Sequence, residues 1–151
     1  MNRSGLARAA IVAALSVFAL TGTAAGAQRY ASPTGTAAAS SGCHEDAACD
    51  IFAALDLGFV NLGDEVLLAP GTYNVSQQVY IGAGVNIHGT GRPEQTRIVS
   101  SYGGTISVAV VNTLATLSDV QVETSDSSVA ALGVINGFAR RIVAINNSYG
   151  A

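Results

Sequence analysis

Short apolar runs alternate with turn residues over most of the chain. From Gly63 onward each run is only a few residues long and ends in Gly, Pro, Ser or Asn. No stretch there has the length or the spacing of an amphipathic helix, so the pattern predicts an all-β fold with short strands. The expected strands are Val66–Ala69, Val79–Ile81, Val85–Ile87, Arg97–Val99 and Ile106–Val111.

One segment ahead of these runs has helical spacing. Asp46–Gly58 opens on a residue type that caps helices and closes on a glycine, which commonly ends them. Its apolar side chains recur at the helical period and so share one face. We therefore predict a short amphipathic helix with Asp46 as its N-cap.

Two later runs repeat the pattern of Val85–His88. Val120–Glu123 and Val143–Asn146 both read apolar, polar or small, apolar, polar. In a solenoid such copies stack at a strand spacing of about 4.8 Å. The expected inner ladders are Val85/Val120/Val143 and Ile87/Val122/Ile145, with His88, Glu123 and Asn146 facing outward.

The alternative all-β interpretation is a sandwich of antiparallel strands. Neighbouring strands of a sandwich are commonly joined by two-residue turns of the Asn-Gly or Asp-Gly type. Asn136–Gly137 is the one such pair in the sequence. The pattern therefore favours the solenoid.

The beginning of the chain has the layout of a secretory signal peptide. Arg3 and Arg8 make a basic start, Ala9–Leu20 is an apolar run with Ser16 as its one polar residue, and Ala25–Ala27 is a small-residue cleavage site. The alternative is an uncleaved anchor, for which the apolar run is short. We expect residues 1–27 to be removed on export, which leaves a secreted or surface-associated chain without a membrane span.

The charge balance argues against one class of partner. The chain has 7 Lys+Arg, all of them arginine, against 10 Asp+Glu. Arg3 and Arg8 belong to the leader, so the exported part is more acidic than the whole. It has no sizeable basic patch, which argues against nucleic acid and anionic membranes. A polyanion would need a bridging cation such as Ca²⁺.

Two cysteines, Cys43 and Cys49, lie close together in the sequence. In an exported chain they are expected to pair. Closing so short a loop stabilises the fold by about 2 kcal/mol in the loop-entropy model. The alternative is a metal site that also uses His44, Glu45 and Asp46, although no further Cys or His pair is present to complete it.

The stretch from Gly63 to Gly91 carries motifs that resemble a known family. Gly63-Asp64 with Val66, followed by Pro70–Tyr73, is similar to the opening of pectate lyase-like right-handed parallel β-helices. Val85–Gly91 is similar to a strand of the same family. Ahead of it, Tyr30–Gly35, the cysteine pair and the helix resemble the start of many secreted bacterial β-helix proteins.

The resemblance implies an organisation for the exported chain. A linker or first strand at residues 28–42 leads into a capping helix and disulfide at 43–62, and a β-helix of two to three coils fills 63–151. Leu55 and Phe59 would plug the open end of the first coil. Pro70–Gly71 would turn the chain around a corner in a type II turn, and Tyr73 would pack with its hydroxyl at the rim.

The resemblance also implies where chemistry would lie. Lyases of the family use Ca²⁺ held by Asp and Glu together with an arginine base, and the hydrolases use clustered Asp, on outward faces of middle coils. The candidates here are Asp119, Glu123 and Asp126 for calcium, and Asp119, Arg140 and Arg141 for catalysis. The alternative is that all of these are solvated side chains at strand edges and turns, as we expect for His88. Neither family cluster is matched residue by residue, and no cofactor other than calcium is suggested.

These observations predict a secreted β-helix module that is non-catalytic and either binds carbohydrate or is structural, like an adhesin. The alternative is a polysaccharide lyase or glycoside hydrolase with its site in later or missing coils. A solenoid needs a cap at each end, and no capping pattern is present after Val143–Asn146. We therefore expect a longer β-helix, or a last coil that docks on another chain.

Overall fold

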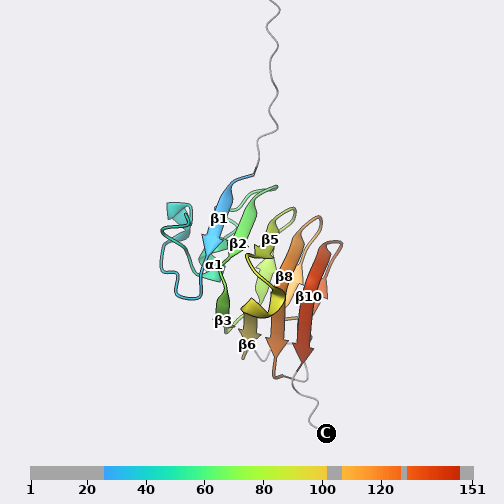
Figure 1. Ribbon diagram of the computed structural model, residues 1–151. Helices are drawn as coiled ribbons and strands as arrows, with labels where there is room; N and C mark the ends of the chain where they lie inside the picture. Colours follow the sequence, from blue (N-terminus) through green and yellow to red (C-terminus); the bar gives the residue numbers. More distant parts are fainter. Residues whose placement is uncertain (1–25, 102–106, 127–128, 147–151) are drawn as a thin grey trace, which may run out of the picture.

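The chain folds into a parallel β-solenoid of about three turns, shown in Figure 1. This computed structural model describes residues 26–101, 107–126 and 129–146. All its neighbouring strands are parallel, which confirms the predicted solenoid and contradicts the sandwich. No helix in these ranges is long and apolar enough to cross a membrane. Of the predicted leader only Gly26 and Ala27 are described, and the predicted continuation or docking coil at the other end lies outside the described residues.

The strands lie on three faces, which we number in chain order. Face 1 holds β1 (Gln28–Ala31), β2 (Glu65–Leu68), β5 (Asn86–Gly89) and the first halves of β8 (Thr116–Thr124) and β10 (Phe138–Asn146). Face 2 holds β3 (Gly71–Val75), β6 (Thr96–Ser100) and the second halves of β8 and β10. Face 3 holds β4 (Val79–Ile81), β7 (Ala109–Val111) and β9 (Leu132–Val134). In Figure 1 face 1 extends from β1 at one end of the molecule to β10 at the other.

Helical structure within the described ranges is confined to three short segments: η1 (Ala39–Ser41), α1 (Ile51–Ala54) and η2 (Pro93–Gln95). The predicted strands are present wherever the chain is described, although Ile106 lies outside the described residues. The sequence pattern does not predict β3 and β9. It misses β3 because this strand begins directly at the Pro70–Gly71 corner, with no further turn residue between them.

Stacked apolar side chains form the core. On face 1, Val66, Ile87 and Leu117 occupy the same register position and are buried. On face 2, Ile98 and Val122 do the same. Alternating side chains of each strand therefore point into the solenoid, as the period of two along a β-strand requires.

The predicted ladders have the wrong register. Gln121–Thr124 stacks on Arg97–Ser100 of face 2, so the run Val120–Glu123 does not stack on Val85–His88 of face 1. Val143 pairs with Gln121, one residue away from the expected partner. Asn146 is predicted to face outward, but it pairs with buried Thr124 and lies on the same side of the sheet. Glu123 faces outward as predicted, although it is only 6 % exposed.

The cause is a change in how the chain passes the corner between faces 1 and 2. Between β5 and β6 this corner takes a loop that contains η2. In β8 a single residue, Asp119, makes the same corner with φ 57°, and in β10 Arg141 makes it with φ 47°. Coils of unequal length therefore bring similar runs onto different faces.

The corner between faces 3 and 1 has a constant geometry. One residue with positive φ occurs there in each turn: Gly63 (91°), Gly84 (71°), Leu114 (59°) and Asn136 (54°). Backbone hydrogen bonds join successive corners, from Gly63 N to Gly84 O and from Leu114 N to Asn136 O, both 3.0 Å. Glycine and asparagine tolerate this conformation, whereas a leucine is strained in it.

Replacing Leu114 with asparagine is therefore expected to raise the free energy of unfolding by about 1 kcal/mol. Leu114 is 65 % exposed, so little packing is lost. The matched control is Ile135→Asn, because Ile135 is 55 % exposed at the next corner and has an ordinary φ. Denaturant unfolding should show stabilisation for the first variant only; a loss of stability in Leu114→Asn would contradict the assigned strain.

The corner at Pro70–Gly71 differs from the predicted type II turn. Gly71 has a positive φ, as expected, but at 141° it is extended and already begins β3. A Cβ at this position would lie 2.6 Å from Pro33 Cγ, so the site needs glycine for space as well. Tyr73 packs in the first coil as predicted, yet its hydroxyl is enclosed, 2.9 Å from the carbonyl oxygen atoms of Ala31 and Ala69. Burial raises the pKa of this hydroxyl.

The capping helix is shorter than predicted and begins later. Its N-cap is Asp50, whose Oδ1 accepts hydrogen bonds from Phe52 N (2.7 Å) and Ala53 N (2.8 Å). Asp46 is not the cap, because it lies in a turn bridged by His44 and Ala47. Leu55 is buried as predicted, but Phe59 is 46 % exposed and does not plug the solenoid.

Candidate functional site

A groove of about 710 Å³ lies beside the end of β1. One wall comes from the solenoid, where Tyr30 and the corner residues Ala69, Pro70 and Thr90 lie. The other comes from the turn after β1 and from the loop inside the disulfide. We call this the β1 groove and define it by Tyr30, Thr34, Thr36, Glu45, Asp46 and Thr90.

The outer edge of β1 is hydrogen-bonded to the disulfide loop. Tyr30 N donates to Cys43 O (2.6 Å), Cys49 N donates to Tyr30 O (3.1 Å), and Ser32 N donates to Cys49 O (3.0 Å). The predicted disulfide between Cys43 and Cys49 is present, with both residues fully buried. The loop wall is thus held against the edge strand by backbone bonds and by a covalent link.

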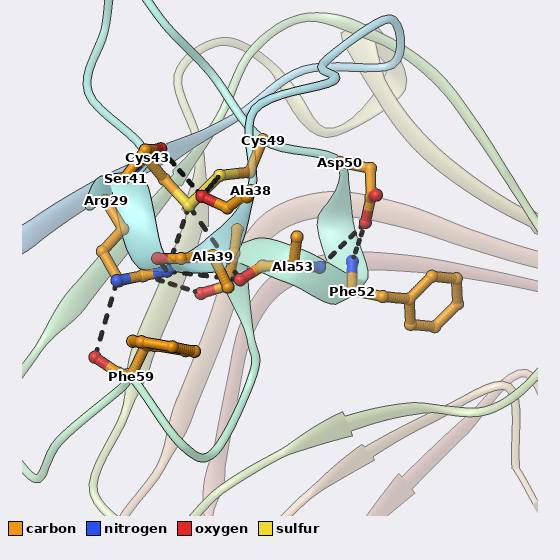
Figure 2. The surroundings of a disulfide bond; sticks show 11 residues. Arg29, Ala38, Ala39, Ser41, Cys43, Cys49, Asp50, Phe52, Ala53 and Phe59 are labelled. Atoms are coloured by element: carbon orange, nitrogen blue, oxygen red, sulfur yellow. Dashed lines mark hydrogen bonds between the residues drawn. A yellow bond between two sulfur atoms is a disulfide. The ribbon is translucent and has the colours of Figure 1, made fainter.

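A buried arginine contacts the segments on both sides of this loop, as Figure 2 shows. Arg29 is 5 % exposed and shares the inward side of β1 with Ala31. Its guanidinium donates to Ala54 O (3.0 Å), Ala39 O (3.0 Å) and Ala53 O (3.2 Å), and lies 3.0 Å from Cys43 Sγ. None of the ion pairs among the described residues includes Arg29. In the described structure backbone carbonyl groups and the Cys43 sulfur therefore surround this charge, without a carboxylate.

The groove combines an aromatic ring with many polar groups. Tyr30 is half-buried and lies on the outward side of β1, where its hydroxyl donates to Gln28 Oε1 (3.4 Å). Four hydroxyl groups join it, from Ser32, Thr34, Thr36 and Thr90. Glu45 and Asp46 add two exposed carboxylates, and no basic side chain lines the groove among the described residues. The site therefore offers a flat apolar surface, both hydrogen-bond donors and acceptors, and negative charge.

The two acids predicted for metal binding or catalysis, Asp119 and Glu123, are each paired with an arginine. Arg141 holds Asp119 through both carboxylate oxygen atoms, which lowers the pKa of that carboxyl. Arg97 holds Glu123 in the same way, at 2.6 and 3.0 Å, and lowers the pKa of Glu123, to which Gln121 also donates. Bidentate pairs of this kind fix the geometry of both partners.

The remaining candidates lie apart from one another. The Arg140 guanidinium is 5.8 Å from the centre of the Phe138 ring. Asp126 follows β8, and its backbone N–H donates to Thr124 Oγ1. His88 Nε2 is 3.3 Å from Glu65 Oε1, an ion pair when the imidazole is protonated.

The described residues contain no group of three or more His, Cys, Asp or Glu side chains that could hold a metal ion. Asp119, Glu123 and Asp126 are therefore not brought together as a calcium site in this structure. The catalytic roles of Asp119, Arg140 and Arg141 remain predictions.

No family model, no curated protein and no solved structure matches this chain.

The β1 groove is the feature that sequence reasoning misses. Its residues come from four separate segments of the chain, so no single sequence motif predicts it. Part of the signal was present: Tyr30–Gly35 is a strand followed by a turn, and Glu45 and Asp46 lie inside the cysteine loop. The sequence does not predict that Thr90, at the corner after β5, lies next to Ala69 and Pro70 in the solenoid wall of the groove.

Proposed function

We propose that this protein is a secreted, non-catalytic β-solenoid that binds carbohydrate in the β1 groove. We also propose that it is a divergent, right-handed member of the pectate lyase-like superfamily, on the strength of the Gly63–Gly91 motifs. The observation that carries the binding proposal is the Tyr30 ring set among hydroxyls and carboxylates. A sugar ring has an apolar C–H face that packs on an aromatic ring, and it has hydroxyls that need donors and acceptors around it.

The rigidity of the groove supports binding. The disulfide and the Arg29 contacts hold the loop wall in place before any ligand arrives. A site that is already in its binding conformation loses little conformational entropy on binding. The absence of catalysis is proposed because Asp119 and Glu123 are each held by an arginine.

The test is calorimetry with a panel of neutral, amino and acidic oligosaccharides. Tyr30→Ser is expected to weaken binding about twofold to tenfold, since stacking on an aromatic ring contributes roughly 0.5–1.5 kcal/mol. Tyr80→Ser is the matched control, because Tyr80 is a 42 % exposed tyrosine on β4 of face 3. Absence of binding to every oligosaccharide, or an equal loss in both variants, would overturn the proposal. Cleavage of a polysaccharide that disappears in Asp119→Asn would replace it with the enzyme alternative.

A further inference from the structure

The charge of the β1 groove narrows the class of sugar it can take. Glu45 and Asp46 are both exposed on the loop wall, and neither has a hydrogen-bond or ion-pair partner within the described ranges. Other acids near this end are engaged: Asp50 caps α1, and buried Asp64 accepts from Ala27 N and Asn61 N, both at 2.8 Å. The two groove carboxylates are therefore available to a ligand.

The loop fixes the backbone that carries these two side chains. They are the middle residues of the turn from His44 to Ala47, which is closed by a hydrogen bond from Ala47 N to His44 O (3.0 Å). The turn lies within the loop closed by Cys43 and Cys49. Because the backbone is fixed, little ordering is needed to present the two charges together.

We propose that the β1 groove selects sugars that carry a protonated amine, such as glucosamine units of a deacetylated polysaccharide. This inference rests on the proposed carbohydrate-binding function. The Tyr30 ring packs on the sugar face, while Glu45 and Asp46 accept hydrogen bonds from the ammonium groups of neighbouring units. A uronic acid polymer meets like charge on the same wall and is disfavoured.

The expected preference is modest because the carboxylates are exposed. One exposed ion pair contributes roughly 0.2–1 kcal/mol, so two pairs favour an amino sugar over its neutral counterpart by about twofold to thirtyfold. The preference should shrink as salt is added, whereas the contribution of Tyr30 should not change.

The test compares oligomers of equal length made of glucosamine, N-acetylglucosamine or galacturonate. Calorimetry at low salt and about pH 5 should rank them in that order. In Glu45→Gln/Asp46→Asn the preference for the amine should disappear while binding of the neutral oligomer remains. The control is Glu94→Gln, because Glu94 is an exposed acid on η2 outside the groove.

Each outcome is decisive. Neutral and amino oligomers bound equally in a Tyr30-dependent manner would overturn this inference and leave carbohydrate binding standing. Failure to bind any oligomer would remove both proposals. Equal binding of oligolysine that survives Tyr30→Ser would show that charge alone attracts cations, and would overturn the assignment to a sugar.

Discussion

Replacing Arg29 with methionine is expected to lower the free energy of unfolding by about 3 kcal/mol. The side chain donates to the carbonyl groups of Ala39, Ala53 and Ala54 in a buried site. Methionine fills a similar volume but leaves these acceptors without a partner. Each unsatisfied buried acceptor costs about 1–3 kcal/mol, and relief from burying a charge offsets part of the sum.

The loss should appear first where the disulfide loop meets β1. Amide hydrogen exchange should accelerate at Tyr30 N and Cys49 N, which take part in the bonds between that loop and the edge strand. Exchange at Val122, in the middle of β8, should change less. Urea unfolding followed by circular dichroism measures the total effect.

Two comparison variants separate the geometry of the arginine from its charge. Arg29→Lys keeps the charge but cannot donate as a planar fork, so an intermediate loss is expected. Arg140→Met removes an exposed arginine, and its effect should stay within about 0.5 kcal/mol. If Arg29→Met is as stable as the wild-type protein, the carbonyl groups find other partners and Arg29 does not hold the cap.

Individual strands and the short helix can be predicted from the sequence. Short apolar runs between turns identify β2, β4, β5 and β6, and the repetition of the Val85–His88 pattern favours a solenoid even though its copies lie on different faces. The cysteine pair and a helix near Ile51 are also predicted. These features depend on neighbours along the chain, so the sequence carries them directly.

The register cannot be predicted in the same way because it depends on the length of each corner. A loop with η2 and a single residue such as Asp119 both complete the same corner, and both are compatible with the apolar pattern. The position of Arg29 is a partial exception. Side chains alternate between the two faces of the strand Gln28–Ala31, so Arg29 lies on the same side as Ala31 and is expected to point inward. What it would contact becomes evident only once α1 is in place.

The contacts of the predicted site residues are the least predictable part of the structure, because they also depend on the register. The resemblance to pectate lyase-like proteins suggests Asp119, Glu123 and the arginines, because enzymes of that family use charged residues on middle coils. In the structure two of these acids are engaged in ion pairs with arginines from stacked strands. Which acid meets which arginine on the neighbouring coil depends on the strand register, and the sequence does not determine this register.

The observed strand register leads to a second prediction with a large expected effect on stability. Ile98→Ala is expected to lower the free energy of unfolding by about 3 kcal/mol, because the side chain is fully buried and stacks on Val122. Double-mutant cycles then distinguish the two possible ladders. Residues in contact show coupling energies of about 0.5–3 kcal/mol, whereas separated residues are nearly additive.

The pairs Ile98/Val122 and Ile87/Leu117 should couple strongly, since each pair shares a register position on one face. The pair Ile87/Val122, which the sequence pattern places in one ladder, should be closer to additive, because these residues lie on different faces. Urea unfolding of the single and double alanine variants measures all three couplings. A larger coupling for Ile87/Val122 than for Ile98/Val122 would mean that β8 stacks on β5 along its whole length, and that the corner at Asp119 is misplaced.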